Sequence, residues 1–549
     1  MNSKMWLRRA PALVTAILAG SSLLGAADSD EISNLKAALA AQQKQIEMLQ
    51  QSINRLTAAT APAQPANLGN VASLTPVIPA PAPAPTMAIP AIPGPQAAAA
   101  PAGGNPCEAP LDTASAPAYL RLGGVCIAPV GFMDLTGVWR NEATGSGIGT
   151  NFASIPYNNA VTGRLSEFRF SMQNSRLGFR ADGNWMGAHF IGYNEFDFLG
   201  TSGGNNLGVT NGAVVPRARL YWVDITKGKI EFLAGQSWSL LTPGRTGISP
   251  LPGNLFYSQV MDVNYLTGLT WTRQPGLRVV YHPSKTMAFA FAVEQPNQYI
   301  GGSSGAPAIT LPSALAALAG TQFDNGSNFL TTPNLAPDFI AKIAMDPNSK
   351  VHVELAGLER TFKDWNPNTN LYFTKVGGGV SLNANLEVVK NIRLISNNYW
   401  SDGGGRYLFG QAPDVIIRSD GSISPIHAGG FNEGFEAREG KTLIFGYWGG
   451  TYVGRDVSLD ANGTTLIGYG FHGASNSNNR MIQEVTFGFN QTFWSNPRYG
   501  AINFIGQYQY TMRSPWYWTT GVAGGKDAKD DAIYFDVRYT LPGASPSFN

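Results

Sequence analysis

Charged side chains are scarce in this chain. Of its 549 residues only 13% are Asp, Glu, Lys or Arg, which is about half of the usual fraction. The formal net charge is +2, and setting aside three N-terminal cations (Lys4, Arg8 and Arg9) leaves 35 basic and 36 acidic residues. The composition therefore does not favour nucleic acid as a partner.

Long apolar runs and histidine clusters are also missing. After the N-terminal segment, no window holds the roughly 18 consecutive apolar residues of a membrane-spanning helix. The histidines are scattered, and no HExxH motif is present. They are His189, His282, His352, His427 and His472. We therefore expect no catalytic residues, no metal site and no cofactor, and the chain is not predicted to be an enzyme.

Cysteine is almost absent as well. Only Cys107 and Cys126 occur, without the CxxC spacing of redox motifs. Both lie in the part of the chain that would be exported, and an oxidising compartment favours their pairing. We predict a structural disulfide between them.

The first 27 residues have the pattern of a secretory signal peptide. A basic start precedes the apolar stretch "APALVTAILAGSSLLG", and small residues precede Asp28. This apolar stretch is short for a permanent anchor. The alternative, a retained N-terminal anchor helix, is less favoured by these flanks.

Residues 28–57 contain a heptad repeat. Its two seam positions are Ile32, Leu39, Ile46 and Ile53 on one side, and Leu35, Gln42, Leu49 and Leu56 on the other. The alternating spacing of three and four residues predicts a coiled coil. A single amphipathic helix lying on its own domain is the alternative. Ile and Leu at these positions favour two strands, so the number of helices stays open.

Residues 58–126 follow as a Pro- and Ala-rich linker that ends in the segment closed by the predicted disulfide. Stretches such as "VIPAPAPAPTMAIPAIPGP" have almost no charge and tend to polyproline II structure. We predict a semi-rigid spacer, for which peptidoglycan is a candidate partner.

From residue 127 to 549 short alternating segments recur. "EFRFSM" (167–172) and "AIYFDVRYTL" (532–541) place apolar and polar side chains on opposite faces, and "RARLYW" (217–222) places Arg217, Arg219 and Tyr221 opposite Ala218, Leu220 and Trp222. This is the period of a β-strand. A soluble sandwich would turn the apolar faces inward, whereas a membrane β-barrel would turn them toward lipid.

Three features favour the barrel. The segments have about ten residues, the length of a tilted membrane strand. Aromatics gather at segment ends, as in "SPWYWTT" (514–520) and "NQTFWSNPRY" (490–499). Short turns alternate with long loops, as in outer-membrane barrels. The short turns are Asp182–Gly183, 226–229, 346–350 and 495–498, and the long loops are 199–215, 239–264, 296–335 and 401–440.

Counting the segments gives sixteen strands, an even number that suits a closed antiparallel barrel with an aqueous interior. The predicted strands are 129–139, 165–181, 185–198, 216–226, 229–238, 269–282, 286–295, 337–345, 350–361, 371–386, 391–400, 441–454, 464–471, 481–494, 499–510 and 531–541. The fold class is therefore an all-β, 16-stranded antiparallel transmembrane barrel.

Several stretches resemble known porins. "SRLGFRADGNWMGAHFIGYNEF" (175–196) resembles two strands of general trimeric porins, and "AGQSWSLLTP" (234–243) and "WTRQPGLRVVY" (271–281) resemble the DcaP-like porins. The resemblance implies a homotrimer in the bacterial outer membrane, in contact with lipid, with its coiled coil in the periplasm. It also implies passive uptake of small organic anions such as carboxylates.

The resemblance also implies which residues line the channel. In the porin pattern the Arg of "SRLG" faces the pore, and Arg273 matches the Arg of "RQP". Segment 239–264 is the third outside loop by our count and is the expected constriction loop. The pore-lining candidates are Arg176, Arg180, Arg217, Arg219, Arg273, Arg245 and Asp262. An arginine wall suits carboxylates, because guanidinium groups are planar and permanently charged. A structural envelope tether and an outer-membrane barrel enzyme remain as alternatives.

Overall fold

The computed structural model describes residues 119–542, together with Lys44. Gaps within this range are 201–213, 256–258, 303–306, 317–318, 327–328, 475–477 and 519–527. The predicted signal peptide and, apart from Lys44, the predicted coiled coil lie outside the described residues, as does most of the linker with Cys107. These features, the disulfide included, stay predictions.

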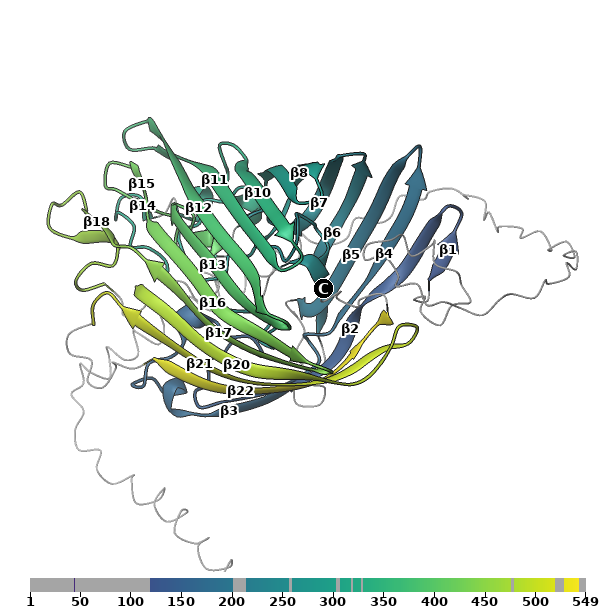
Figure 1. Cartoon of the computed structure of the whole chain (residues 1–549). Helices are drawn as coiled ribbons and strands as arrows, with labels where there is room; N and C mark the ends of the chain where they lie inside the picture. The colour runs from purple at the N-terminus through teal and green to yellow at the C-terminus, as the bar shows by residue number, and fades with distance from the viewer. Residues whose placement is uncertain are drawn as a thin grey trace, which may run out of the picture. The chain divides into compact units, whose positions relative to one another are not determined.

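Sixteen antiparallel strands form a closed barrel, as predicted (Figure 1). Pairing of the first barrel strand with the last, from Phe132 with Thr540 to Arg140 with Ala532, closes the sheet. The barrel strands are β2 (Val125–Arg140), β4 (Arg176–Trp185), β5 (Ala188–Gly200), β6 (Val215–Lys227), β7 (Ile230–Trp238), β8 (Arg273–Ser284), β9 (Met287–Glu294), β10 (Asp338–Asn348), β11 (Val351–Asn366), β12 (Leu371–Val389), β13 (Ile392–Asp402), β16 (His427–Glu439), β17 (Thr442–Val453), β20 (Asn479–Asn496), β21 (Gly500–Pro515) and β22 (Lys529–Thr540).

Six shorter strands lie beside the barrel or in its loops. β1 (Leu120–Leu122) and β3 (Glu167–Ser171) pair with β2, whereas β14 (Val415–Ile417) with β15 (Ile423–Pro425) and β18 (Asp456–Leu459) with β19 (Leu466–Tyr469) form two small hairpins. The described helical segments are short: 152–154, 162–164, 252–254, α3 (Ala319–Gln322), 329–331 and 405–407. None of them has the length and hydropathy of a transmembrane helix.

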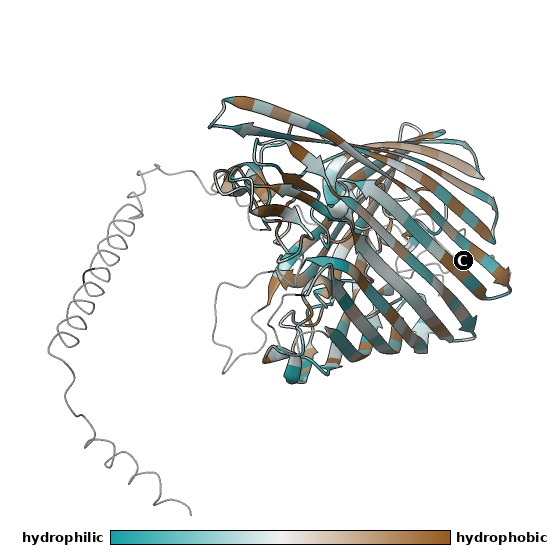
Figure 2. Ribbon diagram, turned by 90° about the vertical axis from the view of Figure 1, so that its left-hand side faces the viewer, coloured by the Kyte–Doolittle hydropathy of each residue, from teal (hydrophilic) through white to brown (hydrophobic). Residues whose placement is uncertain are grey.

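The barrel wall is apolar outside and polar inside. Along β22, Ile533 and Val537 are 49% and 54% exposed on the outer face, whereas Tyr534 and Asp536 are buried inside. The same alternation appears as brown and teal bands along the strands in Figure 2. A soluble sandwich would have the opposite polarity, so this arrangement supports the membrane barrel.

Turns and loops alternate between the two ends of the barrel. At the short-turn end, the predicted turns at 226–229, 346–350 and 495–498 are confirmed. At the long-loop end the connections are loop 1 (141–166), loop 2 (201–214), loop 3 (239–272), loop 4 (295–337), loop 5 (367–370), loop 6 (403–426), loop 7 (454–478) and loop 8 (516–528). The predicted long loops 239–264 and 296–335 are confirmed, whereas 201–213 of the predicted loop 199–215 lie outside the described residues.

The predicted turn at Asp182–Gly183 is wrong. β4 continues through these residues, and the turn lies at Met186 and Gly187. Both residues have positive φ, 51° and 74°. Two positive φ angles define the type I′ turn, whose twist matches that of the flanking strands.

The predicted count of sixteen is right because two errors cancel. Segment 464–471 is not a barrel strand, since its strand β19 pairs with β18 inside loop 7 and, at Gly468, with Thr310 of loop 4. Conversely, the predicted loop 401–440 contains the barrel strand β16, paired with β13 and β17. The sequence of β16, "HAGGFNEGFEARE", has three glycines, which are unusual in a strand and led to its assignment as loop.

A β-bulge in β6 changes which side chains face the interior. Glu195 of β5 pairs with Leu220, whereas the next residue, Phe196, pairs with Ala218. The extra residue reverses the phase of the strand. The inward direction predicted for the two arginines of this strand is correct. Beyond the bulge the prediction is wrong, because Trp222 is buried inside and Tyr221 is 66% exposed outside.

The barrel begins slightly earlier than the predicted boundary at residue 127. β2 starts at Val125, so Cys126 lies within the first spanning strand and not before it. Cys126 is fully buried and pairs in register with Asp182 of β4.

Candidate functional site

Loop 3 crosses the interior of the barrel to the opposite wall. Arg245 forms a bidentate ion pair with Glu436 of β16, with N–O distances of 2.9 and 3.0 Å. The hydroxyl of Tyr447 on β17 donates to Glu436 at 2.8 Å and accepts the backbone N–H of Gln259 at 3.1 Å. The loop thus narrows the lumen.

The first part of loop 3 is held by the wall at β10 and β11. The backbone N–H of Gly244 donates to Glu354 at 3.1 Å, and that of Gly247 donates to Asp346 at 2.9 Å. Glu354 also accepts a hydrogen bond from the buried ammonium of Lys342 at 3.1 Å. These contacts fix the start of the loop before it turns across the barrel.

The last part of loop 3 lies flat against the wall. A Cβ on Gly449 would lie 2.4 Å from the carbonyl oxygen of Thr267, and one on Gly430 would lie 2.4 Å from that of Gly268. Such close backbone approach requires glycine on the wall strands. Gly430 is one of the three glycines that led to the assignment of β16 as a loop. Its missing side chain allows the backbone of loop 3 to approach the wall.

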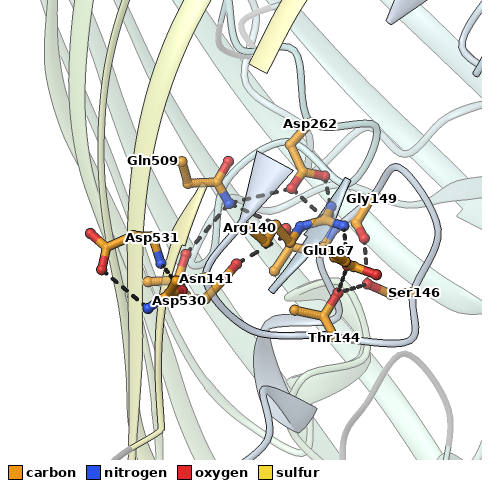
Figure 3. A network of polar contacts seen from close by, with 12 residues as sticks. Arg140, Asn141, Thr144, Ser146, Gly149, Glu167, Asp262, Gln509, Asp530 and Asp531 are labelled. Carbon is orange, nitrogen blue, oxygen red and sulfur yellow. Dashed lines mark hydrogen bonds and ion pairs between the residues drawn. The ribbon is translucent and has the colours of Figure 1, made fainter. Parts of the chain in front are cut away.

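Loops 1 and 3 are joined to the wall by a buried polar network (Figure 3). Asp262 accepts the backbone N–H of Thr150 at 3.0 Å and the hydroxyl of Tyr534 at 3.0 Å. Arg140 pairs with Glu167 at 2.8 Å and donates to the same Tyr534 hydroxyl at 2.9 Å. Asp262 therefore joins loops 1 and 3 to the barrel wall, and it also lines the cavity described next.

Below loop 3, toward the short turns, the interior holds a cavity of about 940 Å³, here called the vestibule. Its wall comes from β2, β4, β5, β12, β13, β16, β17, β20, β21 and β22, and loop 3 forms its roof. Seven cationic and four acidic side chains line it: Arg176, Arg180, Arg245, Arg393, Arg438, Lys441 and Arg538, with Glu195, Asp262, Glu387 and Glu436. The side chains that line the vestibule therefore carry an excess of positive charge, although behind the lining Asp182 pairs with Arg180, and Asp134 and Asp536 pair with Arg538.

Four of the seven predicted pore residues line the vestibule. They are Arg176, Arg180, Arg245 and Asp262. Arg176 donates to the hydroxyl of Tyr265 in loop 3 at 3.1 Å, and Arg180 pairs with Asp182 at 2.7 Å. Arg245 and Asp262 belong to loop 3, as predicted.

The other three predicted residues lie beside the roof and do not line the vestibule. Arg219 pairs with Glu195 at 2.7 Å and with Asp197 at 2.8 Å, and Arg217 pairs with Asp197 at 2.6 Å. Arg273 stacks on Trp238, with its guanidinium carbon 5.4 Å from the ring centroid. The arginines of β6 are thus largely neutralised by the carboxylates of β5.

Four further cations of the vestibule were not among the predicted residues. They are Arg393, Arg438, Lys441 and Arg538. Arg538 was visible on the polar face of the last strand. Arg438 was hidden because β16 was assigned to a loop, although Asn432, Glu436 and Arg438 lie on one face there and Phe431, Phe435 and Ala437 on the other.

The long-loop half of the barrel is filled by loops 4 and 6. Arg360 of β11 is 1% exposed and pairs with Asp338 at 3.1 Å and with Asp414 of loop 6 at 2.8 Å. Arg406 of loop 6 also pairs with Asp338, at 3.1 Å. Burial raises the pKa of Asp414, although both arginines act in the opposite direction.

An apolar cluster surrounds these buried ion pairs. Ile300 and Phe323 of loop 4 pack with Leu408 and Ile416 of loop 6 against the inner wall. This half of the barrel contains a buried apolar cluster, in contrast to the vestibule. Among the described residues, no group of three or more His, Cys, Asp or Glu is placed to hold a metal ion.

No family model matches the chain. No curated protein matches it either. Among solved structures, the outer membrane channel DcaP of Acinetobacter baumannii is similar at 15% identity and a TM-score of 0.56, over 77% of this chain and 99% of that one. The chain has the fold of an outer-membrane porin. The resemblance to DcaP-like porins is confirmed at the level of the fold.

An anion-selective porin from Comamonas acidovorans is also similar, at 12% identity and a TM-score of 0.42, over 76% of this chain and 99% of that one. OmpF of Salmonella typhi, in complex with daunomycin, has 11% identity and a TM-score of 0.42, over 77% of this chain and 100% of that one.

Proposed function

We propose that the chain is a bacterial outer-membrane channel for passive diffusion of small hydrophilic solutes and that it favours small organic anions such as carboxylates. The observation that carries this proposal is the vestibule of about 940 Å³, enclosed by a barrel with an apolar outer wall and lined by seven cations against four carboxylates.

The charge excess supports anion preference on physical grounds. Between the barrel wall and loop 3, a unit charge pair at 4 Å is worth about 4 kcal/mol, against about 1 kcal/mol in bulk water. Guanidinium groups also present planar donors that match a carboxylate. Because the cations are spread over several strands, no single site would hold a solute long enough to block passage.

Tyr265 of loop 3 joins Arg176 of the vestibule to Arg219 beside the roof. The hydroxyl of Tyr265 accepts hydrogen bonds from Arg176 at 3.1 Å and from Arg219 at 3.2 Å. Tyr265 and Arg219 are only 4% and 3% exposed, so in this proposal the anion meets Arg176 on the vestibule side and not Arg219. Arg217 and Arg219 are paired with Asp197 and Glu195, so in this proposal they add little positive charge beside the roof.

Conductance of the full chain in planar lipid bilayers tests the proposal. We expect stepwise ohmic conductance and a reversal potential that favours anions under a salt gradient. Arg393→Gln/Arg438→Gln removes two vestibule charges and should lower anion preference about fivefold, the factor equivalent to ~1 kcal/mol. A silent wild-type protein would favour the tether or the enzyme instead.

A matched control is available outside the lumen, in a turn at the short-turn end of the barrel. Arg498 lies in the turn between β20 and β21, exposed, and its guanidinium carbon is 5.9 Å from the ring of Tyr499. Arg498→Gln should leave the reversal potential unchanged. An equal shift in both variants would mean that surface charge, and not the vestibule, sets selectivity.

For the assembly we propose a homotrimer whose N-terminal coiled coil lies in the periplasm. The support is the heptad of residues 28–57 together with the porin fold. Ile46→Asp places a charge in the predicted seam and should lower the thermal stability of the trimer without producing monomers, because barrel walls also associate. Light scattering and thermal melts measure this, and an unchanged melt would contradict the coiled-coil contribution.

A further inference from the structure

A row of aromatic side chains crosses the outer face of the barrel at its long-loop end. Trp400 of β13 and Tyr452 of β17 stack with ring centroids 6.0 Å apart, and Trp516, just after β21, meets Tyr452 edge-on at 6.1 Å. Trp400 can lie over β16 because Gly429 is beneath it, where a Cβ would come within 2.6 Å of the indole. Aromatic rows of this kind mark the membrane–water interface.

Two arginines lie beside the last ring of this row. The guanidinium carbon of Arg480 is 5.1 Å from the ring centroid of Trp516, and that of Arg455 is 5.6 Å from it. Arg455 also donates to the hydroxyl of Tyr517 at 2.5 Å. Both guanidinium groups therefore lie beside the same indole ring, that of Trp516.

The nearby carboxylates are engaged elsewhere. Asp456 contacts Arg418 at 4.0 Å, and Asp402 is hydrogen-bonded to His427. Within the described part of the chain, neither Arg455 nor Arg480 has a carboxylate oxygen within 4.0 Å, and both side chains are exposed. Two like charges beside one ring repel each other, so this corner favours an anion.

We propose that Arg455, Arg480 and Trp516 bind the phosphate headgroup of a lipid in the outer leaflet. Guanidinium groups bind phosphate oxygens through paired N–H donors. The acyl chains of the same lipid would lie against the apolar outer wall, where Trp448 and Val485 are 48% and 49% exposed. This inference goes beyond the channel activity. The two proposals share only the orientation of the barrel in the membrane, in which the long loops face outward.

Calorimetric titration tests the site. The purified full chain in a non-ionic detergent is titrated with a diphosphorylated glucosamine lipid that carries short acyl chains. Because each cation near an anionic membrane surface contributes about 1 kcal/mol, Arg455→Gln/Arg480→Gln should weaken binding about 30-fold. Arg455→Lys/Arg480→Lys should lose less, since the charge remains.

The matched control removes two exposed cations at the opposite end of the barrel. Arg498→Gln/Lys227→Gln should bind the lipid as the wild type does. Conductance of each variant verifies that the barrel is folded, and it is expected to be unchanged. Because conductance is measured separately, failure of the lipid site and failure of the channel proposal are distinguishable.

Three outcomes would overturn the proposal. Wild-type affinity in Arg455→Gln/Arg480→Gln would show that these arginines do not hold the headgroup. Equal binding of a lipid analogue without phosphates would show that only the aromatic row is used. Equal affinity for inorganic phosphate would assign the site to a free anion and not to a lipid.

Discussion

The two halves of the barrel interior place arginines in opposite situations. In the short-turn half, Arg393 and Arg438 line a vestibule of about 940 Å³. In the long-loop half, Arg360 is also on the inner wall, but it is 1% exposed between Asp338 and Asp414. The comparison teaches that an inward arginine can act on a solute only where the loops leave it hydrated.

The largest effect is expected from breaking the buried ion pairs of the long-loop half. Arg360→Ala leaves Asp338 and Asp414 in an apolar surrounding without their main partner. Removing one partner of a buried pair costs about 3–5 kcal/mol. We expect loop 6 to detach, and limited proteolysis of the folded protein should cut within 403–426 much faster.

Arg418→Ala is the control for that experiment. Arg418 lies in the same loop, but its side chain is 47% exposed and its contact with Asp456 is 4.0 Å long. Exposed pairs contribute about 0–1 kcal/mol. Equal cleavage of the two variants would show that Arg360 does not hold the loop.

A smaller effect is expected from moving the roof of the vestibule. Gly449→Val places a side chain where the carbonyl of Thr267 now lies, and overpacking of this kind costs about 1–3 kcal/mol. Loop 3 should leave the wall, and single-channel conductance should change. Gly357→Ala on β11 is the control, because nothing lies within 4 Å of its added Cβ. A conductance of Gly449→Val equal to that of the control would contradict the assigned contact.

A still smaller effect is expected at the arginines beside the roof. Arg217 is 40% exposed, and its partner Asp197 is also held by Arg219. Arg217→Gln should therefore shift the reversal potential less than Arg393→Gln/Arg438→Gln does. A larger shift of the reversal potential in Arg217→Gln would indicate that the residues beside the roof, and not those of the vestibule, set the selectivity. Arg219 is a poorer test residue, because its loss would leave Glu195 buried without its arginine.

The smallest effect is expected from reduction of the predicted disulfide. Peptide mapping by mass spectrometry under non-reducing conditions should find Cys107 joined to Cys126. Cys126 lies at the short-turn end of β2, away from loop 3, so conductance should survive reduction. Two free thiols in the exported protein would refute the pairing.

Strand alternation predicted the barrel well, because the side-chain period of a strand is set by covalent geometry. It failed where the backbone departs from that period. The bulge beside Arg219 reversed the phase of β6, and the glycines of β16 resembled a loop until the contact of loop 3 explained one of them.

The vestibule could be predicted only in part. Arg176 and Arg245 were found through the porin resemblance, which carries information about position along the chain. Arg393 and Arg438 were missed, because which strands face the hollow half depends on where loops 4 and 6 fold. No local pattern in β13 or β16 contains that information.

The network around Asp262 has a consequence for how the protein folds. The hydroxyl of Tyr534, which holds both Asp262 and Arg140, belongs to the last strand, 272 and 394 residues farther along the chain. Loops 1 and 3 therefore cannot reach their final positions until β22 has paired with β2. Contacts of such sequence separation make folding slow, and until closure both terminal strands present unpaired edges. The interior of the channel is thus among the last parts of the protein to form.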